Sequence, residues 1–589
     1  CAPRAKSASR SAWSRLPRKS ESGGAKCWRA VLKNVVPRHV GQPTDGAGSF
    51  VETDRRALGR PGPVRGCCEN YTPGTVAAKP PRSIGGGDMS EQKSTSLEER
   101  FAAIDEAESV EGGTPRKALI GLIIAFGLLF LIHFAPTLPG LKPASQSVLA
   151  VFVWFIAVMV TDSLPKAIVG LAAPLLVVLL AGVKPGDAFK AFSTDIFMLG
   201  VGAFVIAGIM MGTPLGKRIA LTIVTLMRSN KVTRIQIGLG AADVAVGSVL
   251  PTVSETALFL PVTKAISTLM RGKEHLPEVK RINMAMLLQT PGLTPLFTGT
   301  LILTSHFPNI MLAGQLKASA GIYISWLDWF WLNLPLWGLL PIMFWYVFSY
   351  FKLWKLEIPG AAVEIPKLKN ELGPTTWPEI WGLICIGIGL VLWITEGYHK
   401  IQSGMVALIT ASLLFMPWGK IDFKKVNPHI MWDTLILLGG AISLGTVLYD
   451  VGTVKWLANI IVEPVKGLGL PTLAMMFVLA FAMHIARAGI VSAVAMGAAF
   501  IPLLLAMATT LDLNVLPFTL VLTNCLSYAF FLPISITAFL IAWGASGASG
   551  WTAIKFGTGL SIISNVYVLL VQTAWLALIG YPLSGPIAK

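Results

Sequence analysis

The sequence predicts an all-α protein that crosses a membrane many times, and three observations lead to this fold class. First, 53% of the 589 residues are hydrophobic, only 13% are charged, and the mean hydropathy is +0.65. A soluble chain carries about 25% charged residues. Second, apolar runs of about 20 residues, the length that spans a bilayer, recur from residue 118 onward. Backbone groups in lipid must bond within their own segment, so we expect these runs to be helices.

The third observation is an internal repeat. Residues 195–224 (DIFMLGVGAFVIAGIMMGTPLGKRIALTIV) resemble residues 433–462 (DTLILLGGAISLGTVLYDVGTVKWLANIIV). The shift of 433 − 195 = 238 positions aligns Asp195 with Asp433, and each copy ends in a basic stretch. Many secondary transporters consist of two similar halves, with the substrate site near the midplane where the halves meet. The repeat therefore favours a transporter.

The first 88 residues differ from the rest. They hold 16 Lys and Arg against 6 Asp and Glu, and four of the six cysteines. We expect residues 1–88 to be a basic leader that is not native or is disordered, with Met89 as the natural start. A transit peptide or a nucleic-acid-binding tail fits the scattered acidic, Pro and Gly residues less well. Residues 89–116 are expected to form a polar N-terminal arm in the cytoplasm.

The apolar runs predict eleven membrane-spanning helices and two re-entrant hairpins in an inverted two-fold repeat. The expected spans are 118–136, 147–161, 167–183, 195–212, 282–313, 326–350, 379–396, 404–418, 430–449, 516–545 and 558–581. Apolar segments with a polar break at their centre predict the hairpins, at 235–270 and 470–508. The first repeat is then 117–351, a cytoplasmic linker covers 352–377, and the second repeat is 378–583.

Loop charge predicts the orientation. With the N-terminus in the cytoplasm, the inner loops carry most of the Lys and Arg, above all a basic amphipathic segment at 214–234. This bias follows the positive-inside rule. We therefore expect a protein integral to the bacterial cytoplasmic membrane, with its N-terminus inside and its C-terminus outside. The first hairpin is expected to enter from the cytoplasm and the second from outside.

Four polar breaks in the apolar runs are the candidate substrate site. A broken helix exposes backbone N–H groups at the start of its second half, and with the helix dipole these can hold an anion. Unwound carbonyls and hydroxyls can coordinate sodium. Alternatively, Ser, Thr and Pro here only kink the helices. The candidate substrate-binding residues are Thr252, Val253, Ser254, Thr304, Ser305, His306, Asn309, Ser492, Ala493, Ser535 and Thr537.

Ionisable residues at membrane depth are costly and usually functional. Glu255, His306 and Arg487 are the candidates for a coupling-ion or charge site. His484 is expected to be a hydrogen-bonded packing residue, and Asp243 has no assigned role. The sequence offers no metal-ligand cluster beyond a possible sodium site.

Four stretches of the chain resemble the divalent anion:sodium symporter family, the dicarboxylate, citrate and sulfate permeases. The resemblance covers roughly residues 117–583 and is carried by TDSLPKAIVGLAAPLLVVLLAG, DIFMLGVGAFVIAGIMM with LGKRIA, WDTLILLGGAISLGTVLYDVG and GTLILTSHFPNIMLAG. The family has Ser-Asn-Thr at each hairpin tip, where this chain has Pro251-Thr252-Val253 and Ser492-Ala493-Val494. The family's Gly-Thr-Pro-Pro-Asn is replaced by Ser305-His306-Phe307-Pro308-Asn309 and, in the second copy, by residues 535–539.

The resemblance implies secondary transport of small divalent anions, di- or tricarboxylates or sulfate, by a homodimer whose transport domains move as elevators. Sodium symport, proton coupling and anion exchange all remain open, and His306 or Arg487 at a former cation site fits exchange or proton coupling. The partners are the anion, membrane lipid and a second copy, with no nucleic acid. The only cofactor expected is sodium, as a coupling ion.

Other functions are an ion antiporter or an arsenite-type efflux permease of a related inverted-repeat fold, or a channel or receptor that has lost transport. The sequence has no Gly-x-x-x-x-Gly-Lys-Ser/Thr motif, so nothing points to an ATP-driven pump. It also has no convincing hydrolase triad, and we expect no enzyme activity.

Overall fold

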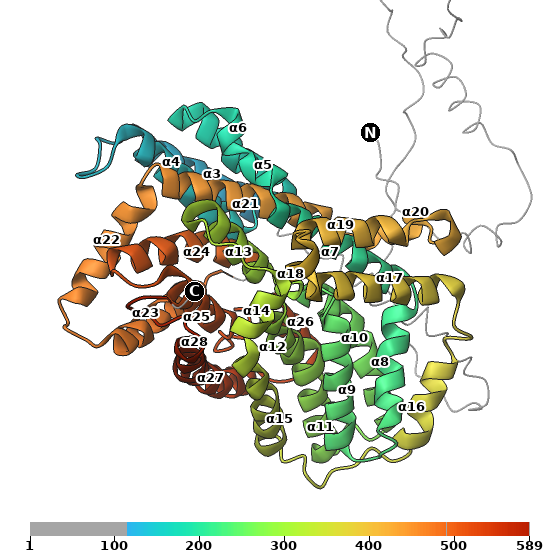
Figure 1. Cartoon of the computed structure of the whole chain (residues 1–589). Helices are drawn as coiled ribbons and strands as arrows, with labels where there is room; N and C mark the ends of the chain where they lie inside the picture. The colour runs from blue at the N-terminus through green and yellow to red at the C-terminus, as the bar shows by residue number, and fades with distance from the viewer. Residues whose placement is uncertain (1–114, 491, 588–589) are drawn as a thin grey trace, which may run out of the picture. The chain divides into compact units, whose positions relative to one another are not determined.

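The computed structural model describes residues 115–490 and 492–587, and their regular elements are all helices (Figure 1). The expectations for residues 1–88, and for all but the end of the 89–116 arm, concern residues outside this range. The first helices are α3 (Pro115–Phe134), α4 (Pro143–Thr161), α5 (Lys166–Ala181), α6 (Pro185–Ala188) and α7 (Asp195–Gly212).

The next helices include the first hairpin and the first interrupted run. They are α8 (Leu215–Leu226), α9 (Val232–Gly247), α10 (Thr252–Ser267), α11 (Pro277–Leu288), α12 (Thr294–Leu301), α13 (Phe307–Ala320), α14 (Trp326–Leu332), α15 (Leu339–Tyr350) and α16 (Ala361–Asn370). A π-helical turn, Gln289–Leu293, joins α11 to α12. The amphipathic segment expected over 214–234 ends at Leu226, because the first hairpin helix already begins at Val232.

The second half follows the linker. Its helices are α17 (Trp377–Ile394), α18 (Glu396–His399), α19 (Ser403–Leu414), α20 (Phe423–Val426), α21 (Trp432–Asp450), α22 (Thr453–Lys466), α23 (Thr472–Arg487), α24 (Ala493–Thr510), α25 (Val515–Ser527), α26 (Thr537–Ser546), α27 (Gly550–Tyr567) and α28 (Thr573–Leu578). The linker between the halves contains α16, so it is partly helical.

Within the described residues, seven helices are long and apolar enough to cross a membrane, or eight if α14 and α15 form one span bent by 58°. Several of the eleven expected spans are shorter apolar helices, such as the 12-residue α19. Others are broken in two, as α12 and α13 are. The membrane fold is therefore confirmed in its class, whereas the number of spans stays a prediction.

The two halves meet through equivalent helices. Helix α5 packs against α21, and α7 packs against α19. The 238-residue shift places α5 on α19 and α7 on α21, so the two contacts correspond. Glycines allow both approaches: a Cβ at Gly440 would lie 1.8 Å from the Gly170 carbonyl oxygen, and one at Gly202 would lie 2.5 Å from Ala407. Small residues let membrane helices approach closely in this way.

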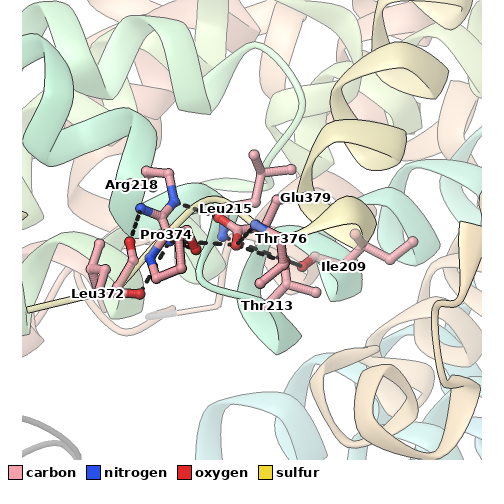
Figure 2. A network of polar contacts seen from close by, with 9 residues as sticks. Ile209, Thr213, Leu215, Arg218, Leu372, Pro374, Thr376 and Glu379 are labelled. Carbon is pink, nitrogen blue, oxygen red and sulfur yellow. Dashed lines mark hydrogen bonds and ion pairs between the residues drawn. The ribbon is translucent and has the colours of Figure 1, made fainter. Parts of the chain in front are cut away.

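Helix α8 connects α7 to the first hairpin and is fixed at one end by an ion pair (Figure 2). Arg218 Nε donates to Glu379 Oε2 at 2.6 Å, across the start of α17. The other guanidinium nitrogens donate to the carbonyls of Leu372, Gly373 and Pro374. Glu379 also accepts from the Thr376 backbone and hydroxyl, which completes a capping box on α17. One arginine thus ties α8 to both the linker and the second half.

Candidate functional site

All four expected helix breaks are present. The segments expected to be hairpins break between α9 and α10 and between α23 and α24, although α24 alone is long enough to span a membrane. The interrupted runs break between α12 and α13 and between α25 and α26. The residues that lead into α13 and α26 share one backbone geometry. His306 has φ −139° and ψ 132°, and Ile536 has φ −140° and ψ 130°. These extended residues each follow a serine, Ser305 or Ser535, and turn the chain into a new helix.

The first hairpin tip is tied to the first unwound segment. The Thr252 hydroxyl lies 3.0 Å from the carbonyl oxygen of Ser305 and 3.1 Å from Nδ1 of His306. The Ser305 hydroxyl donates to the Gly247 carbonyl at the end of α9. Thr304 Oγ1 lies 3.5 Å from the Ser248 carbonyl oxygen. The structure therefore brings four first-half candidates together, Thr252, Thr304, Ser305 and His306, and the three hydroxyls form contacts across the break.

Asn309 completes this cluster from the first turn of α13. Its Nδ2 donates to the carbonyls of Gly299 and Ile302, at 2.7 and 2.9 Å. Because α12 ends here, those carbonyls have no backbone N–H donor from a following helical turn, and the Asn309 side chain donates to them instead. The Asn309 Oδ1 and His306 Nε2 atoms are buried and have no hydrogen-bond partner among the described residues. The hydrogen-bonding capacity of these two atoms is therefore unused by the described residues.

The second-half candidates sit at the matching breaks. Ser535 is fully buried and donates to the Ala529 carbonyl at 2.8 Å, inside the unwound segment before α26. Ser492 caps α24 by accepting from the Ala495 backbone at 3.3 Å. Ala493 and Thr537 are the first residues of α24 and α26. Their backbone N–H groups are among those that a helix start leaves free.

Helices of opposite halves pack across the breaks. Helix α10 contacts α26, and α24 contacts α13.

Two first-half candidates lie apart from the hydrogen bonds of the first-half cluster. The Ser254 hydroxyl contacts Met431 Sδ at 3.6 Å, just before α21, and Val253 is half-buried.

Arg487 is the most unusual side chain of the second hairpin. It ends α23, is 1% exposed, and its Nε and Nη1 atoms have no hydrogen-bond partner in the described part of the chain. Its charge is within electrostatic range of His306. Because an unpaired buried charge is costly, this guanidinium is suited to receiving an anion.

His484 has a packing environment, as expected. Its ring lies 5.9 Å from the Phe531 ring, and Nδ1 contacts the Ala480 carbonyl oxygen. It lines an apolar cavity of about 400 Å³ between α23 and α27.

Sequence reasoning missed the partner of Glu255. The carboxyl groups of Asp243 and Glu255 lie within hydrogen-bond range of each other, and both residues are fully buried. Thr298 on α12 donates to Asp243 Oδ2 at 3.3 Å. The expected hairpin at 235–270 could have indicated this contact. In a hairpin α9 runs antiparallel to α10, so residues on either side of the tip lie close together.

Comparisons with known proteins identify a matching family and several relatives. The family described as the sodium:sulfate symporter transmembrane region matches residues 116–581. A membrane protein of Cupriavidus necator is 26% identical over 486 residues, covering 78% of this chain and 93% of that protein. The sodium-dependent dicarboxylate transporter SdcS of Staphylococcus saprophyticus is 25% identical, covering 77% and 90%. The putative malate transporter YflS of Bacillus subtilis is 26% identical, covering 59% and 73%.

Proposed function

Because the chain belongs to the sodium:sulfate symporter family, the divalent anion:sodium symporters, we propose that it is a secondary transporter of small divalent anions across the bacterial cytoplasmic membrane. The single observation that carries this proposal is the buried guanidinium of Arg487, which has unpartnered nitrogens and lies within electrostatic range of the unwound segment at His306. A dianion placed there would pair with the charge that the described residues leave unpaired.

The proposed substrate is a four-carbon dicarboxylate, with sulfate and citrate as the compounds to compare. Two relatives are named as a dicarboxylate transporter and a putative malate transporter, which favours this class. One carboxylate would bind Arg487 and the helix starts of the second half. The other would bind the helix starts and hydroxyls of the first half, near His306.

The proposed ligands are the residues of the four breaks. The cluster of Thr252, Thr304, Ser305, His306 and Asn309 supports their assignment in the first half, because its buried Nε2 and Oδ1 atoms lack partners among the described residues. Ser492, Ala493, Ser535 and Thr537 are proposed as the second-half ligands through hydroxyl and backbone groups. Val253 and Ser254 are proposed only as the surroundings of the first tip.

We also propose the architecture that the sequence predicts: eleven spans and two hairpins in an inverted repeat, a homodimer, and elevator movement. The correspondence of the α5–α21 and α7–α19 contacts supports the repeat. The proposed boundaries remain 117–351 and 378–583 for the repeats and 352–377 for the linker. The N-terminus is proposed to lie inside and the C-terminus outside.

The coupling ion is a separate question. The relative SdcS is named sodium-dependent, which favours sodium symport. Glu255 and the replaced hairpin tips instead favour protons, and Arg487 and His306 favour exchange without sodium. We propose that transport depends less on sodium than in typical members of the family.

The second candidate function, an ion antiporter or arsenite-type efflux permease, predicts no exchange of dicarboxylates. The deciding experiment is counterflow of labelled succinate, malate, citrate and sulfate in proteoliposomes, with and without sodium. We expect saturable exchange of at least one dicarboxylate, inhibited by the unlabelled compound. If no divalent anion exchanges under either condition, the proposed function is wrong.

A further inference from the structure

The first hairpin buries two carboxyl groups against each other. Asp243 lies on α9, four residues before its end, and Glu255 lies in the first turn of α10. Both side chains are 0% exposed, and their carboxyl groups are within hydrogen-bond range. Asp243 Oδ1 and both Glu255 oxygens have no hydrogen-bond donor in the described part of the chain.

The local structure is shaped to hold this pair. Gly247 ends α9, and a Cβ there would lie 2.1 Å from Glu255 Oε1, so any larger residue would displace the carboxyl group. Thr298 on α12 donates to the other carboxyl group at 3.3 Å. The pair therefore contacts three helices, α9, α10 and α12, and the glycine leaves the space that it occupies.

Two carboxylates are both acceptors, so their contact is unfavourable unless something positive lies between them. Charged or titratable side chains on the hairpin and on the elements packed against it are Asp195, Lys217, Arg218, Arg234, Lys264, Glu278, Lys280, Arg281, His306, Tyr346 and Tyr350. None of these side chains has a hydrogen-bond or electrostatic interaction with the pair in the described structure. There, the two carboxyl groups interact with each other, and Thr298 hydrogen-bonds to Asp243. Arg218 is instead paired with Glu379.

A shared proton fits the chemistry of this site. The two carboxyl groups lie within hydrogen-bond range of each other, so one proton can be shared between them. Among the described residues, no group of three or more His, Cys, Asp or Glu side chains could hold a metal ion. A proton also removes one of the two negative charges from the membrane interior.

The pair is linked to the unwound segment of the candidate substrate site. Gly247, which makes room for Glu255, accepts through its carbonyl from Ser305. Thr252 lies in the same helical turn of α10 as Glu255, and its carbonyl accepts from the Thr256 hydroxyl. The Thr252 hydroxyl contacts Ser305 and His306 in the unwound segment. A change of charge at the carboxyl pair therefore acts on the backbone that positions the anion ligands.

We infer that Asp243 and Glu255 form a proton-binding site, in which the pair takes up one proton on one side of the membrane and releases it on the other as the anion is carried. This inference rests on the proposed transport function. In the proton-loaded state the pair carries one negative charge and can remain buried. Release of the proton leaves two carboxylates, which are stable only where water reaches them.

The test uses the whole protein in proteoliposomes that contain a pH-sensitive dye, in sodium-free buffer with the membrane potential clamped. Wild-type protein is expected to acidify the lumen as labelled succinate enters, and an inward proton gradient is expected to drive net uptake. In Glu255→Gln and Asp243→Asn, succinate counterflow should persist, while proton movement falls at least tenfold. Glu278→Gln is the control, because Glu278 is an exposed acidic residue in the first turn of α11.

A second measurement reads protonation without substrate. Infrared spectra of the purified protein should show a C=O band of a buried protonated carboxyl group that Glu255→Gln and Asp243→Asn each remove and Glu278→Gln retains. If neither substitution changes that band, or if proton movement is as fast in both variants as in wild type, the inference is wrong. Sodium-driven uptake without proton movement in wild type would also overturn it. Failure of counterflow in wild type would instead reject the proposed function, while the infrared result still reports on the pair.

Discussion

At the scale of the residue, substitution of Arg487 distinguishes a role in anion binding from a role in protein stability. The Arg487 Nε and Nη1 atoms have no hydrogen-bond partner in the described part of the chain, so Arg487→Gln breaks no hydrogen bond at these atoms. We expect KM for the transported anion to rise about ten- to hundredfold, which corresponds to about 1.5–3 kcal/mol for a bond to a charged group. Thermal stability without substrate should not fall, because an unpaired buried charge is a cost to the folded state that the substitution removes.

Arg487→Lys provides the comparison for this prediction, since it retains the charge but not the planar fork, and an intermediate KM is expected. Uptake kinetics at matched protein abundance and thermal unfolding in detergent are the two measurements. A large loss of stability with an unchanged KM would show that Arg487 is structural.

Thr252 and Thr256 form a matched pair on α10. The Thr252 hydroxyl contacts the unwound segment at Ser305 and His306, whereas Thr256 Oγ1 donates to the Thr252 carbonyl within the same helix. Both residues are buried. We expect Thr252→Val to lower kcat/KM at least tenfold, since it frees the hairpin tip, and Thr256→Val to lower it less than threefold. Similar effects of the two substitutions would mean that the tip contact has no special role.

At the scale of the element, the Arg218–Glu379 pair tests how α8 is anchored. Glu379 is fully buried, so Arg218→Met leaves a buried carboxylate without its main partner. The expected loss of stability is about 1.5–3 kcal/mol, the size of hydrogen bonds to charged groups. The control is Lys367→Met, which breaks a 2.7 Å ion pair with Glu364 on the exposed side of α16. Exposed pairs contribute about 0–1 kcal/mol. Equal shifts in thermal unfolding for both variants would contradict the proposed anchor.

The contact between α5 and α21 gives a second prediction about an element. A Cβ at Gly440 would lie 1.8 Å from the Gly170 carbonyl oxygen, so Gly440→Ala forces the helices apart. Overpacking of this kind costs about 1–3 kcal/mol. Gly387→Ala on α17 is the control, because no atom lies within 4 Å of the added Cβ in the described structure. Detergent-solubilised protein should unfold at a lower temperature only for Gly440→Ala. An unchanged unfolding temperature for that variant would show that the interface accommodates the added methyl group without loss of stability.

Local sequence patterns at the scale of the element predicted the broken helices well. Pro251, Pro308 and the flanking Ser and Thr residues reveal breaks because proline removes a backbone donor and hydroxyls compete for the backbone. The details of capping were less accessible. Thr194 is the N-cap of α7, whereas the next residue, Asp195, accepts from the Gly404 backbone of α19.

At the scale of the whole molecule, the order of the helices could be predicted from the apolar runs. The similarity of residues 195–224 to residues 433–462 predicted which helices of the two halves correspond. Contacts between distant residues could not be predicted. Arg218 and Glu379 are 161 positions apart, and periodicity does not reveal which charges will pair. Segment length also does not determine the number of spans, because α19 and the broken helices α12 and α13 are shorter than the standard 20 residues. Tertiary packing decides how such segments lie in the membrane.

The orientation of the two hairpins gives the last prediction. If the halves are inverted, both ends of the first hairpin face the cytoplasm and both ends of the second face outside. Exposed flanking positions are Arg228 and Glu274 for the first hairpin, and Leu468 and Asp512 for the second. Single cysteines at these positions, in a background without the six native cysteines, can be tested with a membrane-impermeant maleimide on intact cells.

We expect Leu468→Cys and Asp512→Cys to be labelled in intact cells, and Arg228→Cys and Glu274→Cys only after the cells are opened. Labelling of opened cells by all four variants is the control for reactivity. The ends of one hairpin must agree because two helices of 16 residues, such as α9 and α10, return the chain to the side from which it entered. If Arg228→Cys and Glu274→Cys are labelled from opposite sides, then α9 and α10 do not form a re-entrant hairpin. If all four positions are labelled from the same side, the hairpins remain but the halves are not inverted, and the anion site between opposed hairpin tips loses its geometric basis.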